Sequence, residues 1–176
     1  MSQENEKTMN REDVNRWLAA YIDAWKSYDR DRIGALFSED AEYRYYPGRE
    51  PLRGREAIVA SWLAIRDVEG AYDAHYRVVA VDGEVAIATG TSTYFVEPGG
   101  PIDRVYDNCF VMRFGADGRC RQFADYYSLR ETELLVLELR VVDLTEGEIA
   151  ERVGISQAEV SRILKAHTLE GDGLTE

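Results

Sequence analysis

Hydrophobic residues recur every three to four positions along the first part of the chain, which is the spacing of amphipathic helices. The clearest stretch has a capping-box-like start at Asn10 and continues to Tyr28. A shorter helix can begin at Asp29 and include Phe37, and the segment 54–65 repeats the helical spacing. These patterns predict three helices in the N-terminal part of the protein.

The pattern then changes to the alternation that is typical of strands. An early strand-like run opens at Asp40 and stops at Pro47. Four later runs are separated by the turn sequences DG, EPGGP and GADG, and they cover 72–81, 84–96, 104–114 and 119–128. Because the helices come first and an antiparallel meander follows, the predicted class is α+β.

The last part of the chain has a helical pattern again. Neither glycine nor proline interrupts 130–142, which predicts a connecting helix. Thr145 and Ser156 are each followed three residues later by glutamate, as in a capping box, and Gly154 supplies a turn between them. Two short helices joined by a glycine turn have the form of a helix-turn-helix.

These patterns divide the 176 residues into a helix-and-strand domain and a small all-α element. The expected boundaries are 1–9 for a disordered N-terminus, 10–129 for the first domain, 130–142 for the connecting helix, 143–167 for the helix-turn-helix and 168–176 for a disordered tail. Since we find neither a membrane-spanning run nor a signal peptide, we expect a cytoplasmic protein with no membrane partner.

Charge and motif content restrict the function further. With 33 acidic and 21 basic residues the formal net charge is −12, so any contact with DNA has to come from a local patch. His75 and His167 are far apart, and a GADG hairpin would leave Cys109 and Cys120 about 13 Å out of register. The sequence also lacks phosphate-binding and dinucleotide fingerprints, so we expect no metal, no cofactor and two reduced thiols.

The same hairpin gives a candidate for chemistry. If GADG forms the tip of the hairpin, Asn108 stands opposite Asp125. These two residues share one face of the hairpin with four aromatic residues: Tyr106, Phe110, Phe123 and Tyr127. Partial burial raises the pKa of such a carboxyl toward the range useful for acid or base catalysis. Asp125 is therefore the candidate catalytic residue. The alternative is that it only satisfies Asn108 or a hydroxyl in the core.

Five more aromatic residues are candidate ligand contacts, with core packing as the alternative for each of them. Tyr43 and Tyr45 share one face of the first strand, where a phenol can donate to a ligand oxygen. The others lie on the apolar faces of the first and third predicted helices: Tyr21, Trp25 and Trp62.

The segments WLAAYIDAWKSYDRDRIGALFSEDAEYRYYP, GREAIVASWL and YDNCFVMRFGADGRCRQFADYYSL resemble the SnoaL-like branch of the nuclear-transport-factor-2-like superfamily over about 10–129. The resemblance implies a cone-shaped, curved antiparallel sheet covered by three N-terminal helices. It also implies an apolar pocket, which would take a small apolar or cyclic ligand.

Within that resemblance, FADYYSLRE is similar to the closing segment of limonene epoxide hydrolase relatives, which implies that Asp125 matches a catalytic carboxylate. SnoaL-like cyclases also carry their acid/base on this strand. The stretch TGTSTYFVE at 89–97 lacks the Arg and Asp pair of the hydrolases, which disfavours their way of activating water. Tyr45 stands where ketosteroid isomerases have their base, and a phenol is a poor base at neutral pH.

The stretch LTEGEIAERVGISQAEVSRILKA resembles the helix-turn-helix of SorC-like regulators, in which the element is usually N-terminal. The resemblance implies that the outward side chains of its second helix contact DNA: Gln157, Ala158, Ser161, Arg162 and Lys165. Residues 143–176 hold 3 basic and 8 acidic side chains, a net charge of −5, which opposes phosphate binding. The alternative is a packing or dimerisation appendage.

The leading hypothesis from the sequence is a dimeric, ligand-responsive transcriptional regulator, because two weak DNA readers in a homodimer can bind where one cannot. The alternative is an enzyme of the cyclase, dehydratase, isomerase or epoxide hydrolase type that uses Asp125 as general acid or base. A third hypothesis is a structural dimer whose pocket binds nothing.

Overall fold

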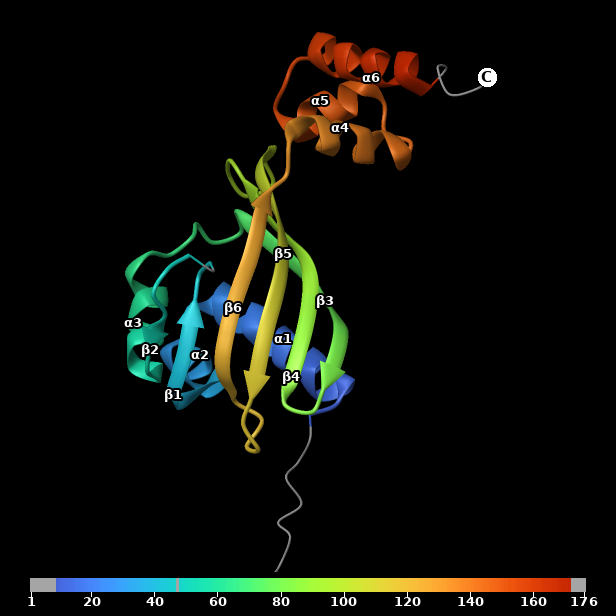
Figure 1. Ribbon diagram of the computed structural model, residues 1–176. Helices are drawn as coiled ribbons and strands as arrows, with labels where there is room; N and C mark the ends of the chain where they lie inside the picture. The colour runs from blue at the N-terminus through green and yellow to red at the C-terminus, as the bar shows by residue number, and fades with distance from the viewer. Residues whose placement is uncertain (1–8, 47, 172–176) are drawn as a thin grey trace, which may run out of the picture. The chain divides into compact units, whose positions relative to one another are not determined.

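The computed structural model describes residues 9–46 and 48–171, and Figure 1 shows its elements in order. The helices are α1 Arg11–Ser27, α2 Arg30–Leu36, α3 Arg55–Ala64, α4 Thr132–Val141, α5 Glu146–Val153 and α6 Gln157–Gly171. The strands are β1 Phe37–Arg44, β2 Leu52–Arg53, β3 Tyr72–Asp82, β4 Val85–Phe95, β5 Ile102–Phe114 and β6 Cys120–Leu129. The predicted α+β class is confirmed.

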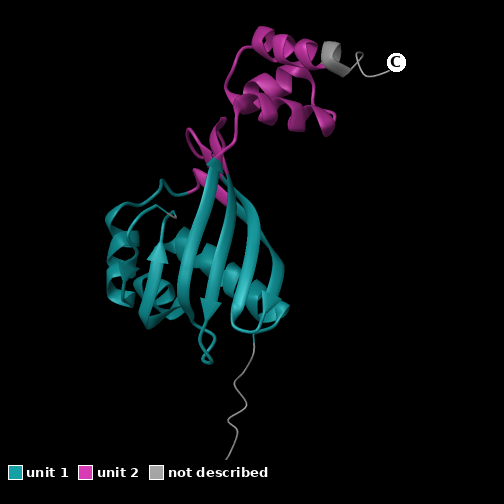
Figure 2. Ribbon diagram, in the orientation of Figure 1, with its two compact units in different colours: residues 1–69, 74–92, 107–128 teal, residues 70–73, 93–106, 129–176 magenta. Residues whose placement is uncertain are grey.

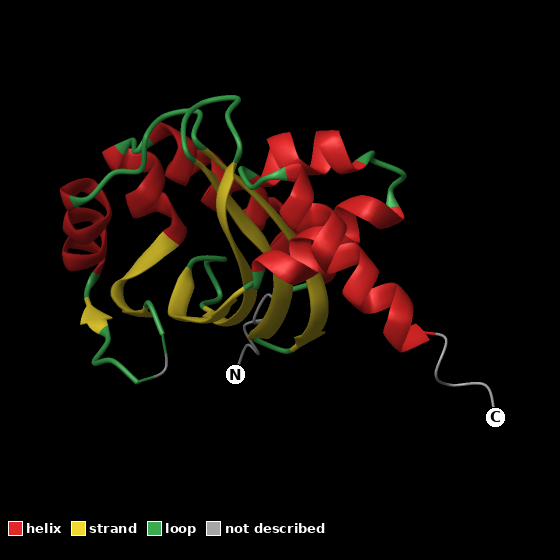
Figure 3. Cartoon of the chain, turned by 90° about the horizontal axis from the view of Figure 1, so that it is seen from above, coloured by secondary structure: helices red, strands yellow, loops and turns green. Residues whose placement is uncertain are grey.

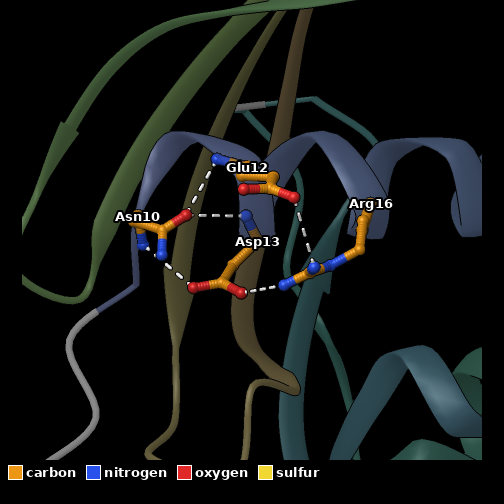
Figure 4. Close-up of polar contacts among 4 residues, drawn as sticks. All are labelled: Asn10, Glu12, Asp13 and Arg16. Atoms are coloured by element: carbon orange, nitrogen blue, oxygen red, sulfur yellow. Dashed lines mark hydrogen bonds and ion pairs between the residues drawn. The ribbon is translucent and has the colours of Figure 1, made fainter.

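The first helix starts where the sequence predicts. The Asn10 side chain accepts hydrogen bonds from the backbone N–H groups of Glu12 and Asp13, at 2.9 and 3.0 Å (Figure 4). The Asp13 carboxylate accepts in return from the Asn10 N–H at 3.3 Å, and Arg16 forms ion pairs with Glu12 and Asp13. A capping box of this kind satisfies backbone donors that the first helical turn leaves without partners.

The sheet corrects the prediction in its strand directions. Its six strands lie in the order β2-β1-β6-β5-β4-β3, and β1 runs parallel to β6, with Tyr43 beside Phe123. The sheet is therefore mixed, although we expected an antiparallel one. The alternation of residues along a strand shows which face is buried, but it carries no information about which distant strand lies alongside.

Two local boundaries also differ from the prediction. Phe37 has extended backbone angles, so it ends α2 and opens β1 instead of belonging to the helix. The two-residue strand β2 was not predicted, because Leu52 and Arg53 are too few to show an alternating pattern. They pair antiparallel with Tyr43 and Glu42 and extend the sheet by one short edge strand.

The chain forms two compact units, coloured separately in Figure 2. The first unit comprises residues 1–69, 74–92 and 107–128, and the second comprises 70–73, 93–106 and 129–176. Figure 3 shows how strongly the strands of the sheet curve. By these bounds, the second unit contains the last residues of β4 and the first residues of β5, as well as the C-terminal helices.

The core of the first unit lies between the helices and the sheet. It is rich in aromatic rings, which bury large apolar areas and prefer tilted or edge-to-face contacts. Trp17 of α1 lies edge-on to Phe37 and Phe114, with ring centroids 6.1 and 5.4 Å away. Its indole N–H donates to the Leu36 carbonyl at 3.0 Å, so the first helix is fixed by packing and by a buried hydrogen bond.

The three C-terminal helices share a small apolar core of their own. Its buried residues are Val136, Ile149, Ala150, Val153, Val160 and Ile163, and the partly buried Leu139, Leu144, Ile155 and Leu164 pack against them. Thr145 and Glu148 form the predicted capping box at the start of α5. Gly154 ends α5 in the left-handed conformation, with φ at 74°, which glycine adopts without strain.

Most of the termini expected to be disordered, residues 1–8 and 172–176, lie outside the described residues. Met9 is buried in the first core, and α6 continues through 168–171, beyond the predicted helix end at 167. Within the described ranges, no helix is both long and apolar enough to cross a membrane.

Candidate functional site

The hairpin of β5 and β6 places an amide against a carboxylate, as the sequence predicts. Asn108 of β5 donates from Nδ2 to both carboxylate oxygens of Asp125 on β6, at 3.2 and 3.0 Å. One pair further along, the rings of Phe110 and Phe123 lie 4.9 Å apart. Asp125 therefore sits at the edge of the aromatic core, held by one amide donor.

The surroundings of Asp125 make its carboxyl a weaker acid than an ordinary aspartate. Burial raises the pKa of Asp125 from 3.8 to about 7, while the hydrogen bond from Asn108 acts in the opposite direction. Protonated and ionised forms are then both populated near neutral pH. A group in this state can take up a proton or give one away, which is the requirement for general acid and base catalysis.

Behind Asn108 the polar contacts continue into the sheet. The Ser92 hydroxyl of β4 donates to Asn108 Oδ1 at 2.9 Å, and the hydroxyls of Ser92 and Tyr76 of β3 lie 2.7 Å apart. Ser92 and Asn108 are the two buried polar residues of the described core. Sequence reasoning missed Ser92 and Tyr76, because their relation to Asp125 depends on the order of three strands.

A second group of polar atoms lies among the aromatic rings of the first core. The hydroxyls of Tyr21 and Tyr43 are 3.1 Å apart, and both rings stack on Phe123 at 5.4 and 4.7 Å. Trp62 of α3 packs edge-on against Tyr21 at 5.1 Å. The Trp62 indole Nε1 is buried and has no hydrogen-bond partner among the described residues. A buried donor without a partner is rare, because it loses its hydration without compensation.

The tyrosines of this cluster stay protonated. Burial raises the pKa of Tyr21, Tyr43 and Tyr76 far above the usual value for a phenol, and the charge of Asp125 raises each of them further. The three hydroxyls come from α1, β1 and β3, and within the described ranges none of them is hydrogen-bonded to Asp125, whose partner is Asn108. They can serve as hydrogen-bond donors but not as bases.

The predicted ligand contacts fall into three groups. Seven residues form the cluster just described: Tyr21, Tyr43, Trp62, Asn108, Phe110, Phe123 and Asp125. Tyr45 and Tyr127 are 40% and 45% exposed, and the Tyr127 ring lies 6.2 Å from that of Tyr46, outside the cluster. The Tyr45 ring is 4.9 Å from that of Tyr43, and the Tyr45 hydroxyl is hydrogen-bonded to Ser61.

The third group is not part of this cluster. Trp25 donates its indole N–H to Asp67 at 2.9 Å and joins a separate polar group with Tyr28. Tyr106 belongs to the second unit, where its ring lies 6.0 Å from that of Tyr94. Helical spacing and strand alternation placed both residues on an apolar face, but neither pattern says which end of that face a side chain occupies.

The candidate DNA contacts lie on one exposed side of α6. Gln157, Ala158, Arg162 and Lys165 are exposed and Ser161 is half-buried. Ser156 caps the helix through a hydrogen bond from the Glu159 N–H at 3.2 Å. Glu159 also lies 3.8 Å from Arg162, an exposed ion pair that solvent screens.

Metal binding has no structural basis among the described residues, where no group of three His, Cys, Asp or Glu side chains is placed to hold an ion. A hollow of about 220 Å³ is lined in part by Glu42, Arg44 and Arg113. Glu42 pairs with Arg53, Arg113 pairs with Glu84, and Arg44 donates to the Arg49 carbonyl, so these charged groups already have partners. The arrangement around Asp125 remains the candidate site.

Residues 18–123 match the family described as SnoaL-like domain, which is more than half of the chain. The chain belongs to the SnoaL-like family. No curated protein sequence matches it.

Several solved structures share the SnoaL-like fold. An LEH-like epoxide hydrolase of M. tuberculosis has 19% sequence identity and a TM-score of 0.51, covering 67% of this chain and 84% of its own. SalBIII, an epoxide hydrolase/cyclase-like enzyme of pyran ring formation in the polyether salinomycin, has 15% identity and a TM-score of 0.55, covering 68% and 93%. A protein of unknown function from Methylobium petroleophilum has 22% identity and a TM-score of 0.50, covering 70% and 81%. At these identities the likeness shows the fold.

Proposed function

We propose that the SnoaL-like domain is an enzyme that isomerises or cyclises a small, uncharged, oxygen-bearing substrate, with Asp125 as general acid and base. The observation that carries the proposal is the position of Asp125. Its carboxyl lies at the edge of the aromatic core, accepts the Asn108 amide on both oxygens, and has a pKa raised by burial to about 7. From the sequence alone, a ligand-responsive regulator is the leading hypothesis and an enzyme is the alternative; we now place the enzyme first.

The site has a single carboxylate, that of Asp125, among the described residues, and this supports a reaction that adds no water to the substrate. Within the described residues, Asp125 takes its polar contact from Asn108, and no second carboxylate influences its pKa. A single carboxylate can remove a proton from one substrate atom and return it to another. In a cyclisation by epoxide opening, for example, the proton of an attacking hydroxyl passes to Asp125. The new C–O bond forms, the epoxide C–O bond breaks, and the proton returns to the released oxygen.

The substrate class follows from the donors in the cluster. In the part of the chain that the structure describes, Trp62 Nε1 has no partner, and one hydrogen bond between the hydroxyls of Tyr21 and Tyr43 leaves one hydroxyl hydrogen for another acceptor. Both donors are neutral, so they suit the oxygen of an ether, epoxide, carbonyl or hydroxyl. The epoxide hydrolase/cyclase-like neighbours support including epoxides among the first substrates tested.

The test compares the wild-type protein with the Asp125→Asn variant on a panel of epoxy alcohols and cyclic ketones, with products followed by NMR. We expect turnover of at least one class to fall by about a thousandfold or more in the variant, while ligand affinity is retained. Asp82→Asn removes an exposed carboxylate of the same domain and serves as the matched control. Equal turnover in Asp125→Asn and wild type would contradict the proposal.

A second candidate function is a ligand-responsive regulator, favoured by the exposed row of α6. Between Gln157 and Ala166 there are 2 basic and 1 acidic side chains, so this surface lacks the acidity of the whole chain. A homodimer could present two such helices to DNA, with ligand binding at Asp125 as the signal.

Selection of bound fragments from random DNA at low salt tests the regulator. We expect enrichment of a two-fold symmetric site that is lost when Arg162 and Lys165 are both changed to Ala. A double variant of Arg32→Ala and Arg77→Ala removes the same charge from exposed positions elsewhere. Without enrichment by the wild type, the regulator would be rejected for the unliganded protein, and the terminal helices would have another role.

A further inference from the structure

Three hydrogen bonds connect Asp125 to a residue two strands away from Asn108. Tyr76 of β3 contacts Ser92 of β4 at 2.7 Å, Ser92 donates to Asn108 Oδ1 at 2.9 Å, and Asn108 donates to Asp125. All four residues belong to the first compact unit. The series runs across neighbouring strands of the sheet and ends at the carboxylate.

The ionised carboxylate determines which way each group points. A carboxylate only accepts hydrogen bonds, so Asn108 has to direct its NH2 group to Asp125 and its carbonyl oxygen to Ser92. Ser92 then gives its hydroxyl hydrogen to that carbonyl oxygen. Because Ser92 has one such hydrogen, Tyr76 has to be the donor in the contact between the two hydroxyls.

The far end of the series favours the same direction. Ser92 is the hydrogen-bond partner of Tyr76 in the described structure. If Asn108 were turned around, Ser92 would donate to Tyr76, and the Tyr76 hydroxyl hydrogen would be left without an acceptor. With Tyr76 as the donor to Ser92, Tyr76 lacks only a donor to its second lone pair, which costs less than an unmet donor.

We propose that Ser92 and Tyr76 are positioning residues, which hold the Asn108 amide so that its NH2 group faces Asp125. Their role in a reaction rests on the proposed function of Asp125, whereas the orientation itself can be measured without a substrate. Neither residue touches the carboxylate through its own hydrogen bond; both act through Asn108.

The consequence is a measurable change in acidity. The NH2 group of Asn108 stabilises the ionised form of Asp125 and opposes the effect of burial on its pKa. The other titratable groups whose charge influences or responds to Asp125 are Tyr21, Tyr43 and Tyr76, and all three stay neutral in the range concerned. Loss of the amide orientation should therefore raise the pKa of Asp125.

The experiment is a pH titration of the Asp125 side-chain carbon by ¹³C NMR in the full-length protein. We expect Ser92→Ala and Tyr76→Phe each to raise the Asp125 pKa by about 1 pH unit, the size of one hydrogen bond to a charged group. Ser92→Thr keeps the hydroxyl and should restore the wild-type titration.

The structure also offers a matched control pair. Tyr45 and Ser61 share a hydroxyl–hydroxyl hydrogen bond of 2.8 Å that does not lead to Asn108. Tyr45→Phe and Ser61→Ala should leave the Asp125 titration unchanged. If Ser92→Ala does not fold, Tyr76→Phe carries the test, because it keeps the ring that packs 4.5 Å from Phe110.

The possible results separate the two proposals. An unchanged Asp125 pKa in Ser92→Ala and Tyr76→Phe overturns the positioning role, and so does an equal shift in the control pair. A specific shift in a protein for which Asp125→Asn alters no turnover supports the positioning role and contradicts the enzyme. Loss of turnover in Asp125→Asn with an unchanged pKa in the Ser92 and Tyr76 variants contradicts only the positioning role.

Discussion

Asp125 combines a charge with surroundings that disfavour it. Folding buries most of its carboxyl at the edge of the aromatic core, and the Asn108 amide compensates only part of the lost hydration. The folded-state pKa of about 7 therefore lies above the ordinary value of 3.8. The native state binds more protons than the unfolded state in this interval, so stability falls as the pH rises. The contribution is complete below about pH 4 and is lost as the pH passes through about 7.

Replacing Asp125 by Asn should stabilise the protein at high pH. We expect the free energy of unfolding at pH 8 to rise by about 2 kcal/mol, roughly half the full effect of the pKa change, since solvent screens a half-buried group. At pH 4 the two proteins should be nearly equal. Urea denaturation at both pH values measures this, with Asp82→Asn as the control. A variant less stable than wild type at pH 8 would contradict the assignment.

For the helices and strands, sequence patterns correctly predicted the features that depend on contacts between residues near one another in the chain. The caps at Asn10 and Thr145 and the facing of Asn108 and Asp125 across a hairpin all involve residues close in sequence or joined by one turn. The parallel pairing of β1 with β6 and the contact of Ser92 with Asn108 depend on which strands become neighbours. That choice is made by the packing of the whole sheet, so no pattern within one strand predicts it.

The cap of α5 gives a prediction at this scale. Thr145 Oγ1 accepts from the Glu148 N–H at 3.3 Å, and the Glu148 carboxylate accepts from the Thr145 N–H at 2.8 Å. Thr145→Ala removes the first bond, together with the one that the Thr145 hydroxyl donates to the Glu148 carboxylate at 2.6 Å, and should destabilise α5 by about 1 kcal/mol. Thr145→Ser retains an oxygen in the same place and should cost much less. Amide hydrogen exchange in α5 would detect the difference, and equal exchange in the two variants would contradict it.

For the whole molecule, the net charge and the exposed surface of α6 lead to opposite expectations about DNA binding. A net charge of −12 opposes contact with nucleic acid, while the sequence ends in helices with an exposed Gln, Arg and Lys row. Sequence comparison identifies the family from residues 18–123, which leaves these helices outside the match. The function of the second unit therefore has to be tested separately from that of the first.

The indole N–H of Trp62 can serve as a spectroscopic reporter of ligand binding. Of its three tryptophans, Trp17 donates to the Leu36 carbonyl and Trp25 to Asp67, whereas the Trp62 N–H finds no acceptor within residues 9–46 and 48–171. In a ¹⁵N–¹H spectrum we expect a ligand with an acceptor oxygen to move the Trp62 indole resonance downfield by more than either of the other two. A response confined to Trp17 or Trp25 would argue against Trp62 as a contact. Compounds could thus be screened by one resonance before any reaction is known.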